Sequence, residues 1–181
     1  ERMKASAVEL GFSFDRHEAR NRIQALCFEL EHAAKLRPLL ARSGEIALEA
    51  LPLPAALEGS AQCIVLPLPV VTSDWRLRHK STDRGFYEAA LTAARQQGAS
   101  EALFVRDDGL VTEGSFTNIF VERGGKLLTP SASLGLLPGV LRRKLIEEGR
   151  AHEAELTLAD LADSFLIGNA TRGLIPARLQ P

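Results

Sequence analysis

A lysine within a basic stretch is the first residue whose type and setting could do chemistry. Lys80 stands where a strand-like run gives way to a helix-like run. The basic residues around it are Arg76, Arg78, His79 and Arg84. Neighbouring positive charge lowers the pKa of a lysine, and a neutral amine can attack a carbonyl to form a Schiff base. The alternative is a solvated loop lysine, and Lys80 taken alone favours that interpretation.

An acid beside a glycine is the second candidate. Glu113, in VTEGSFTNIF, comes at the end of the second strand of a predicted hairpin, next to Gly114. A glycine lets the backbone approach a ligand closely, and the small polar residues that follow are typical of a ligand-facing edge. A strand-end glutamate in water is the alternative interpretation of Glu113.

Two further stretches could bind an anion through backbone N–H groups. LLPGVLRR leads into a helix, whose dipole and free N–H groups at Val140 and Leu141 would attract negative charge. The small residues of GNATRGL, at Asn169 and Ala170, could form a nest for phosphate oxygens. The alternatives are an ordinary helix start and a tight turn that uses Asn169 as its turn residue.

Chemistry links these four features to one cofactor. A Schiff-base lysine, an acid and two backbone anion sites are what pyridoxal phosphate requires. The lysine would hold the aldehyde, the acid would keep the pyridine nitrogen protonated, and the anion sites would take the phosphate.

The elements before residue 60 are predicted from periodicity and caps. Apolar residues at helical spacing predict a first helix that stops at Gly11, and Asp15 could cap a second helix over 16–34. Alternation around Ser43-Gly44 indicates a hairpin. The break PLPAALEGS, at 52–60, is the best candidate linker between two domains. Because the first helix has no cap, we expect residues upstream of Glu1 to be absent from this sequence.

The remainder of the chain mixes strands and helices without a regular βαβ rhythm. QCIVLPLPVV predicts a strand, and DRGFYEAALTAARQQGAS predicts a helix that stops at Gly98. Residues 101–130 contain three strand-like runs with hairpin turns at RDDG and RGGK. A short helix ending at Gly149, a capping-box start at Thr157 and Asp160, and a final strand follow. Mixed sheets are therefore expected rather than a doubly wound fold.

Composition excludes several classes of protein. The 181 residues are 45% hydrophobic and 25% charged with a net charge of −1, which offers no basic face for nucleic acid. No apolar run reaches the ~20 residues that cross a bilayer, and no signal peptide is visible. Cys27 and Cys63 lie in apolar surroundings without metal-type spacing, which predicts two buried thiols in a cytoplasmic protein. The four scattered histidines predict no metal site.

The order of Lys80, EGSFTNIF, LLPGVLR and GNATRGLIPARL resembles the fold-type IV pyridoxal-phosphate enzymes, also known as class IV aminotransferases. The sequences RHKSTDRGFYEAA and GNATRGLIPARL are most similar to those of the 4-amino-4-deoxychorismate lyase-like members. The resemblance implies an α+β fold with a small α/β domain over 1–58 and a larger pseudo-barrel domain over 59–181. It also implies that the cofactor lies between the domains, that the protein is a homodimer, and that the first strands of the small domain are missing here.

The same resemblance assigns a role to each candidate residue. Lys80 would be the catalytic lysine that holds the cofactor, and Glu113 would pair with the pyridine nitrogen. The phosphate would be bound by Arg2, Val140, Leu141, Asn169 and Ala170. Arg2 is assigned because ERMKASAVELGF matches the tail of a His-x-x-Arg-Leu motif of the family, with Met3 in place of the leucine.

Two departures from the family pattern favour the lyase-like members. Aminotransferases often carry a threonine where this chain has Leu141, and Gly-Thr where it has Asn169-Ala170. The leading hypothesis is elimination of pyruvate from 4-amino-4-deoxychorismate through a Lys80 aldimine, which leaves 4-aminobenzoate. The alternatives are transamination of branched-chain or D-amino acids, and a non-catalytic relative or fragment with a binding role. A small anionic amino-acid-like substrate is expected, with neither nucleic acid nor membrane as a partner.

Overall fold

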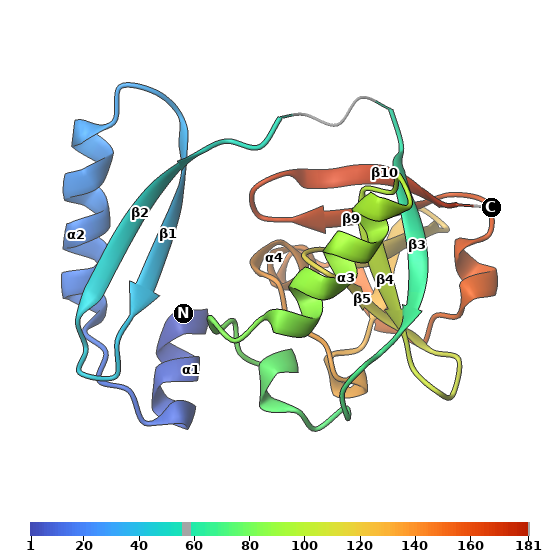
Figure 1. Cartoon of the computed structure of the whole chain (residues 1–181), viewed down its shortest axis with the longest axis horizontal. Helices are drawn as coiled ribbons and strands as arrows, with labels where there is room; N and C mark the ends of the chain where they lie inside the picture. The colour runs from blue at the N-terminus through green and yellow to red at the C-terminus, as the bar shows by residue number, and fades with distance from the viewer. Residues whose placement is uncertain (56–58, 181) are drawn as a thin grey trace. The chain divides into compact units, whose positions relative to one another are not determined.

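The computed structural model describes residues 1–55 and 59–180 (Figure 1). The chain divides into two compact units, Glu1–Ala55 and Ala56–Pro181. The expected boundary between residues 58 and 59, like part of the expected linker, falls at 56–58, outside the described residues. Each unit carries its own sheet, of two strands in the first and eight in the second.

Two helices open the first unit. Helix α1 (Arg2–Leu10) is closed by Gly11, and helix α2 (Arg16–Glu29) begins at Asp15, as predicted. The Asp15 carboxylate accepts hydrogen bonds from the backbone N–H groups of His17 at 2.7 Å and Glu18 at 3.1 Å. These bonds satisfy donors that the first helical turn leaves open. Helix α2 ends earlier than predicted because Leu30 adopts an extended conformation.

A hairpin completes the first unit. Strands β1 (Ala34–Leu40) and β2 (Ile46–Pro52) pair antiparallel around the predicted Ser43-Gly44 turn. Helix α2 is tied to the hairpin by Arg22, whose guanidinium donates to the carbonyl oxygen of Ile46 at 3.0 Å.

The sheet of the second unit is mixed, as predicted, in the order β5-β4-β3-β10-β9-β6-β7-β8. Its strands are β3 (Ala61–Pro67), β4 (Glu101–Val105), β5 (Val111–Gly114), β6 (Asn118–Arg123), β7 (Lys126–Pro130), β8 (Ala151–Ala154), β9 (Phe165–Asn169) and β10 (Gly173–Leu179). Strand β3 pairs parallel with both β4 and β10, whereas β9 pairs antiparallel with β10 and β6. One core cluster contains Cys63, Leu103, Val111, Ile119 and Ile167, which come from five strands. Strands far apart in the order can share a core because the sheet curls around it. A mixed sheet together with helices confirms the predicted α+β architecture.

Residues 101–130 form four strands where the sequence indicated three. Glu113 was expected at the end of its strand, and β5 does end at Gly114; the loop Ser115–Thr117 then separates β5 from β6. The loop is closed by a hydrogen bond of 2.8 Å from the Gly114 N–H to the carbonyl oxygen of Thr117. Strand β8 was not predicted either, whereas both hairpin turns were.

Two helices flank the large sheet. Helix α3 (Gly85–Gln96) lies across β3 and β4 in Figure 1, and its Tyr87, Ala90 and Ala94 pack with Ala102 and Phe104. Helix α4 (Val140–Glu147) lies against the other part of the sheet, where Leu145 packs with Phe120 and Ala151. Short 3-10 helices cover Trp75–Leu77, Ala132–Leu134 and Leu158–Leu161. The last of these begins with the predicted capping box of Thr157 and Asp160.

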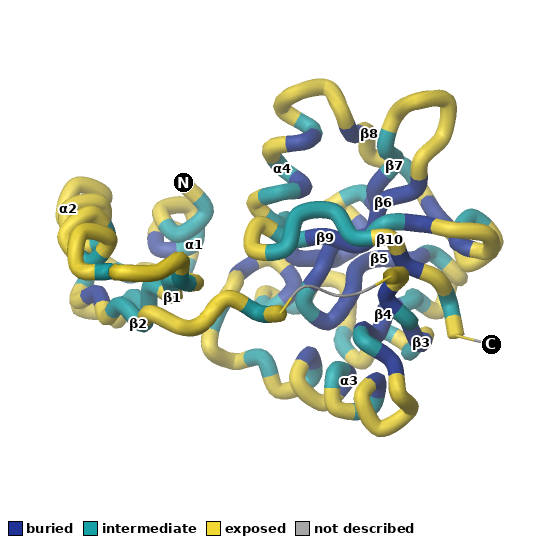
Figure 2. Tube along the Cα trace, turned by 90° about the horizontal axis from the view of Figure 1, so that it is seen from above, coloured by how far each residue is buried: buried dark blue, intermediate teal, exposed yellow. Residues whose placement is uncertain are grey.

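Burial differs between the two units. Figure 2 shows that buried segments concentrate in the strands of the second unit, whereas α2 is exposed along most of its length. The prediction of two buried thiols is wrong for Cys27, which is exposed on α2, and is confirmed for Cys63. Over 1–55 and 59–180, the helices are too short or too polar to cross a membrane.

Candidate active site

Lys80 lies in the loop between the 3-10 helix Trp75–Leu77 and α3, and its side chain is exposed. The expectation that it follows a strand directly is wrong, because β3 has already ended at Pro67. The loop is nevertheless well tied. Asp74 accepts hydrogen bonds from Arg76 at its backbone N–H (2.8 Å), its Nε (3.0 Å) and its Nη2 (2.7 Å).

Glu113 is buried at the end of β5, with 3% of its surface exposed. Its Oε1 accepts a hydrogen bond of 2.6 Å from the Tyr87 hydroxyl, and its carboxylate also accepts one from the Leu137 backbone. Burial raises the pKa of Glu113, and these two bonds and the nearby charge of Arg84 oppose the rise, so that the net pKa is about 8. Glu113 is therefore a buried acid whose ionised form is stabilised by the Tyr87 hydroxyl and the Leu137 backbone rather than by bulk water.

Arg84 fastens the Lys80 loop to the Glu113 region. Its guanidinium lies over the Tyr87 ring, 3.9 Å from the ring centroid, and its Nη2 donates to the carbonyl oxygen of Ser115 at 3.0 Å. The Nη1 atom is buried and has no hydrogen-bond partner among the described residues. Arg84 was predicted only as one basic residue among several near Lys80, and Tyr87 only as part of a helix, so neither was predicted to contact the Glu113 region.

The start of α4 faces the same region. No described side chain caps α4, whose N-cap is Gly139, so helical geometry leaves the N–H groups of Val140 and Leu141 without an intrahelical acceptor. A Cβ on Gly139 would overlap the Asn118 side-chain oxygen. The Asn118 Nδ2 donates to the carbonyl oxygen of Leu137 at 3.0 Å. Since the Leu137 N–H bonds Glu113, this one residue joins the acid to the segment that leads into α4.

The second predicted anion site is the turn between β9 and β10. The Asn169 Oδ1 accepts hydrogen bonds from the backbone N–H groups of Thr171 at 2.9 Å and Arg172 at 3.0 Å. Asn169 is thus a turn residue, which was one of the two interpretations. The turn adjoins α4, because a Cβ on Gly168 would lie 3.0 Å from the Leu141 side chain. Val140 and Leu141 therefore lie near Asn169 and Ala170, as the phosphate prediction requires.

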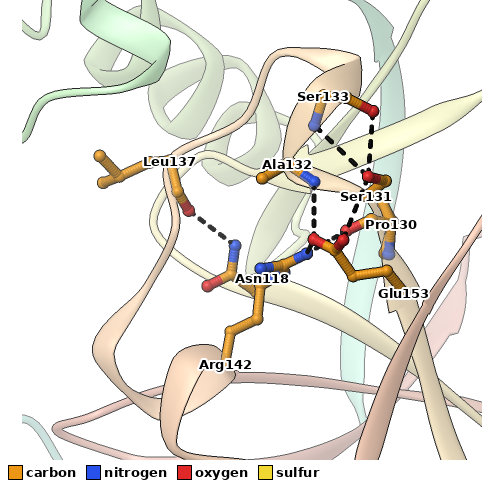
Figure 3. A network of polar contacts seen from close by, with 8 residues as sticks. All are labelled: Asn118, Pro130, Ser131, Ala132, Ser133, Leu137, Arg142 and Glu153. Carbon is orange, nitrogen blue, oxygen red and sulfur yellow. Dashed lines mark hydrogen bonds and ion pairs between the residues drawn. The ribbon is translucent and has the colours of Figure 1, made fainter. Parts of the chain in front are cut away.

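An ion pair between buried Arg142 and exposed Glu153 anchors α4 from the other side (Figure 3). Arg142, with 3% of its surface exposed, pairs with Glu153 and donates to the carbonyl oxygen of Pro130 at 2.7 Å. Glu153 also accepts from the Ala132 N–H at 3.0 Å. That bond and the charge and hydrogen bonds of Arg142 lower the pKa of Glu153. The ion pair fixes the first turn of α4, where the free N–H groups are.

Arg2 begins α1 in the first unit. Its role at the phosphate therefore stays a prediction. The groups within the second unit suit a flat heteroaromatic ring that carries a phosphate. A buried acid can face a protonated ring nitrogen, while an uncapped helix start and the buried Nη1 of Arg84 can meet anionic oxygens.

Comparison with known proteins places these features in a family. A family model described as "Amino-transferase class IV" matches residues 1–179. The crystal structure of a "Putative amino-acid aminotransferase" from Mesorhizobium loti superposes with a TM-score of 0.89 at 36% sequence identity. That match covers 99% of this chain and 88% of the other.

Two curated relatives carry the name of a lyase. A protein named "Putative aminodeoxychorismate lyase" from Schizosaccharomyces pombe is 29% identical over 158 residues, which is 84% of this chain and 68% of the relative. A protein named "Aminodeoxychorismate lyase" from Bacillus subtilis is 41% identical over 83 residues, which is 42% of this chain and 28% of the relative.

Proposed function

Since the chain belongs to the class IV aminotransferases, which use pyridoxal 5′-phosphate, we propose that it acts as a 4-amino-4-deoxychorismate lyase. It would eliminate pyruvate from a small anionic amino-acid-like substrate and leave 4-aminobenzoate. The observation that carries the proposal is buried Glu113, linked through Leu137 to the segment that presents the uncapped start of α4. The relative from Schizosaccharomyces pombe, similar over 84% of the chain, supports the lyase reaction.

Each site residue has a proposed task. Lys80 holds the cofactor through its Nζ and takes up the proton that the substrate releases. Glu113 accepts a hydrogen bond from the ring nitrogen. The phosphate oxygens are bound by Arg2 and by the backbone of Val140, Leu141, Asn169 and Ala170. When bound, the cofactor withdraws electrons from the carbon that bears the substrate amine.

The surroundings of Glu113 support this task. An ionised acid accepts a stronger hydrogen bond from a protonated ring nitrogen than a neutral acid does. Burial works against ionisation, whereas the Tyr87 hydroxyl and the Leu137 N–H bond the carboxylate and favour it. A positive charge on the ring nitrogen would lower the pKa of Glu113 further. The two hydrogen bonds thus favour the ionised form of Glu113, and the charge of a bound ring would favour it further.

Incubation of the purified protein and pyridoxal phosphate with 4-amino-4-deoxychorismate tests the proposal. The lyase should release pyruvate and 4-aminobenzoate in equal amounts, and the Lys80→Ala variant should release neither. A preparation that binds the cofactor but yields no pyruvate would overturn the lyase assignment.

Transamination is the second candidate, and the match to the Mesorhizobium loti structure over 99% of the chain favours it. It would use the same Lys80 and Glu113. A panel of branched-chain, L- and D-amino acids added to the cofactor-loaded protein separates the two candidates. A change of the cofactor absorbance with one class of amino acid, without pyruvate from the lyase substrate, would favour transamination.

A homodimer is the proposed assembly. Phe28 and Val8 in the first unit are 91% and 77% exposed, and Val71 in the second is 71% exposed. A partner subunit that covered them would remove their apolar surface from water. Light scattering coupled to size-exclusion chromatography should give twice the 19.7 kDa of the chain. A monomer at micromolar concentration would contradict the proposal.

A further inference from the structure

Glu101 is a buried acid to which the proposed function gives no task. It opens β4 and has 0% of its surface exposed. Its Oε1 accepts hydrogen bonds from the N–H groups of Ala102 (3.0 Å) and Ser115 (2.9 Å) and from the Ser115 hydroxyl. Its Oε2 accepts one from the Thr117 hydroxyl at 2.7 Å. Burial raises the pKa of Glu101, so the fold bears a desolvation cost to keep an acid at this position.

Three of these four bonds go to one short loop. The loop Ser115–Thr117 joins Glu113 at the end of β5 to Asn118 at the start of β6. Gly114 packs closely against the loop and Glu101. A Cβ on Gly114 would lie 2.5 Å from the Thr117 hydroxyl and 2.9 Å from the Glu101 carboxyl carbon. The Glu101 carboxylate is therefore the inner support on which the loop is folded.

The loop is also where the separate parts of the candidate site meet. Arg84 from the Lys80 segment donates to the carbonyl oxygen of Ser115 at 3.0 Å. Asn169 from the β9–β10 turn donates to the carbonyl oxygen of Phe116 at 3.3 Å. The two residues that flank the loop, Glu113 and Asn118, both bond Leu137 before α4. A change in the loop would move all of these groups relative to one another.

We propose that Glu101 is a positioning residue whose buried carboxylate fixes the Ser115–Thr117 loop and thereby sets Glu113 at the correct separation from the two phosphate-binding segments. Glu101 does not touch the cofactor; it acts through Ser115 and Thr117. The inference rests on the proposed use of pyridoxal phosphate, but it does not depend on which reaction follows.

A matched pair of threonine variants tests the inference. Thr117→Val removes one donor to Glu101. Thr112→Val removes a buried threonine bond from the same hairpin, to the carbonyl oxygen of Phe104 at 3.2 Å, and leaves Glu101 alone. Thr117→Val should weaken binding of pyridoxal phosphate about tenfold and speed amide hydrogen exchange over residues 113–118 of the unliganded protein. Thr112→Val should do neither, and equal effects of the two variants would overturn the inference.

Rescue by an isostere provides a second test. Glu101→Gln keeps an acceptor for the Ala102 and Ser115 donors, whereas Glu101→Leu keeps the approximate volume and offers none. We expect Glu101→Gln to bind the cofactor within about threefold of the unmodified protein and Glu101→Leu to bind it more than tenfold more weakly. Unchanged affinity of Glu101→Leu would refute the inference. If Glu101→Leu does not fold, Thr117→Val decides, and if the unmodified protein binds no cofactor, the exchange measurement still tests the loop while the proposed function fails.

Discussion

The Tyr87 hydroxyl donates a hydrogen bond of 2.6 Å to Oε1 of Glu113, across a separation of 26 residues in the sequence. The bond joins the first turn of α3 to the end of β5. Burial, the charge of Glu113 and this bond all raise the pKa of Tyr87 well above its ordinary value, so the hydroxyl remains a donor at any physiological pH. The ionisation of Glu113 thus depends partly on Tyr87, which also packs in the core.

Tyr87→Phe should raise the pKa of Glu113 further, because it removes a bond to the carboxylate and leaves the burial. Binding of pyridoxal phosphate should weaken about tenfold near neutral pH and recover as the pH rises. Titrating the protein with pyridoxal phosphate at several pH values, followed by the cofactor absorbance, measures the affinity. A loss of affinity that is equal at every pH would indicate a packing defect and would contradict the prediction.

Lys80→Ala should abolish turnover and leave the fold intact, because the side chain is exposed. Borohydride reduction followed by peptide mass mapping should find a pyridoxyl group on Lys80 in the unmodified protein. Lys126, the exposed first residue of β7, provides the control. Lys126→Ala should keep both activity and the adduct, and turnover by Lys80→Ala would refute the assignment.

Gly139→Ala should disrupt the start of α4, because the added Cβ would overlap the Asn118 side chain although the backbone angles suit alanine. Cofactor binding should weaken at least tenfold, and the free energy of unfolding should fall by about 1–3 kcal/mol. Gly85 begins α3 with open space around its Cβ position. Gly85→Ala is therefore the matched control and should be neutral or stabilise by about 0.5 kcal/mol. Chemical denaturation compares the two, and equal effects would contradict the prediction.

The unliganded protein should lose stability as the pH rises from about 5.5 to 8. Glu113 has an ordinary pKa of 4.5 and a folded pKa of about 8, so in this window the unfolded chain is ionised while the folded one binds a proton. The unfolded state binds fewer protons, and the free energy of unfolding therefore falls, by roughly 3 kcal/mol at most. Asp74 and Asp160, whose pKa values are lowered from 3.8, contribute stability that is lost only as the pH falls below that value. Their contribution is constant across this window.

Glu113→Gln should flatten that slope in urea denaturation carried out at several pH values. It should not remove the slope entirely, because the raised pKa of Glu101 acts in the same direction. A slope that is unchanged in Glu113→Gln would show that Glu113 is ionised in the folded protein across the whole range.

Glu153→Gln should lower the free energy of unfolding by about 1–3 kcal/mol, because it leaves the buried Arg142 without a charged partner. Glu147 pairs with Arg143 at 3.7 Å on the exposed face of the same helix. Glu147→Gln is the control and should change stability by less than about 0.5 kcal/mol. Equal losses in the two variants would mean that the ion pair of Arg142 and Glu153 does not anchor α4.

Local signals accounted for much of the fold. The Asp15 cap, the Ser43-Gly44 turn and the Thr157 capping box were all predicted from residue types that bond their own neighbours in sequence. The strand end near Glu113 was predicted from the small polar residues that follow it. The hydrogen bonds of Ser115 to Glu101, 14 residues earlier, were not predicted, because a contact of that kind leaves no local pattern.

The candidate site shows the same division. Val140, Leu141, Asn169 and Ala170 were identified from turn and helix-start patterns, and the structure brings their segments together. Arg84 and Tyr87 were missed, because each also fits an ordinary surface or helix position. Their proximity to Glu113 depends on how α3 packs against β4 and β5, which the sequence of either segment does not encode by itself.

The position of β10 has a consequence for the order in which the second unit can be assembled. This strand is the last of the described elements, yet it lies in the middle of the sheet, between β3 and β9. During synthesis on the ribosome, β3 with β4 and β5 can form one partial sheet, and β9 with β6, β7 and β8 can form another. Until Gly173–Leu179 emerges, each partial sheet presents an unpaired edge that can bind another chain. The segment that follows the candidate phosphate turn is therefore also the one that completes the fold.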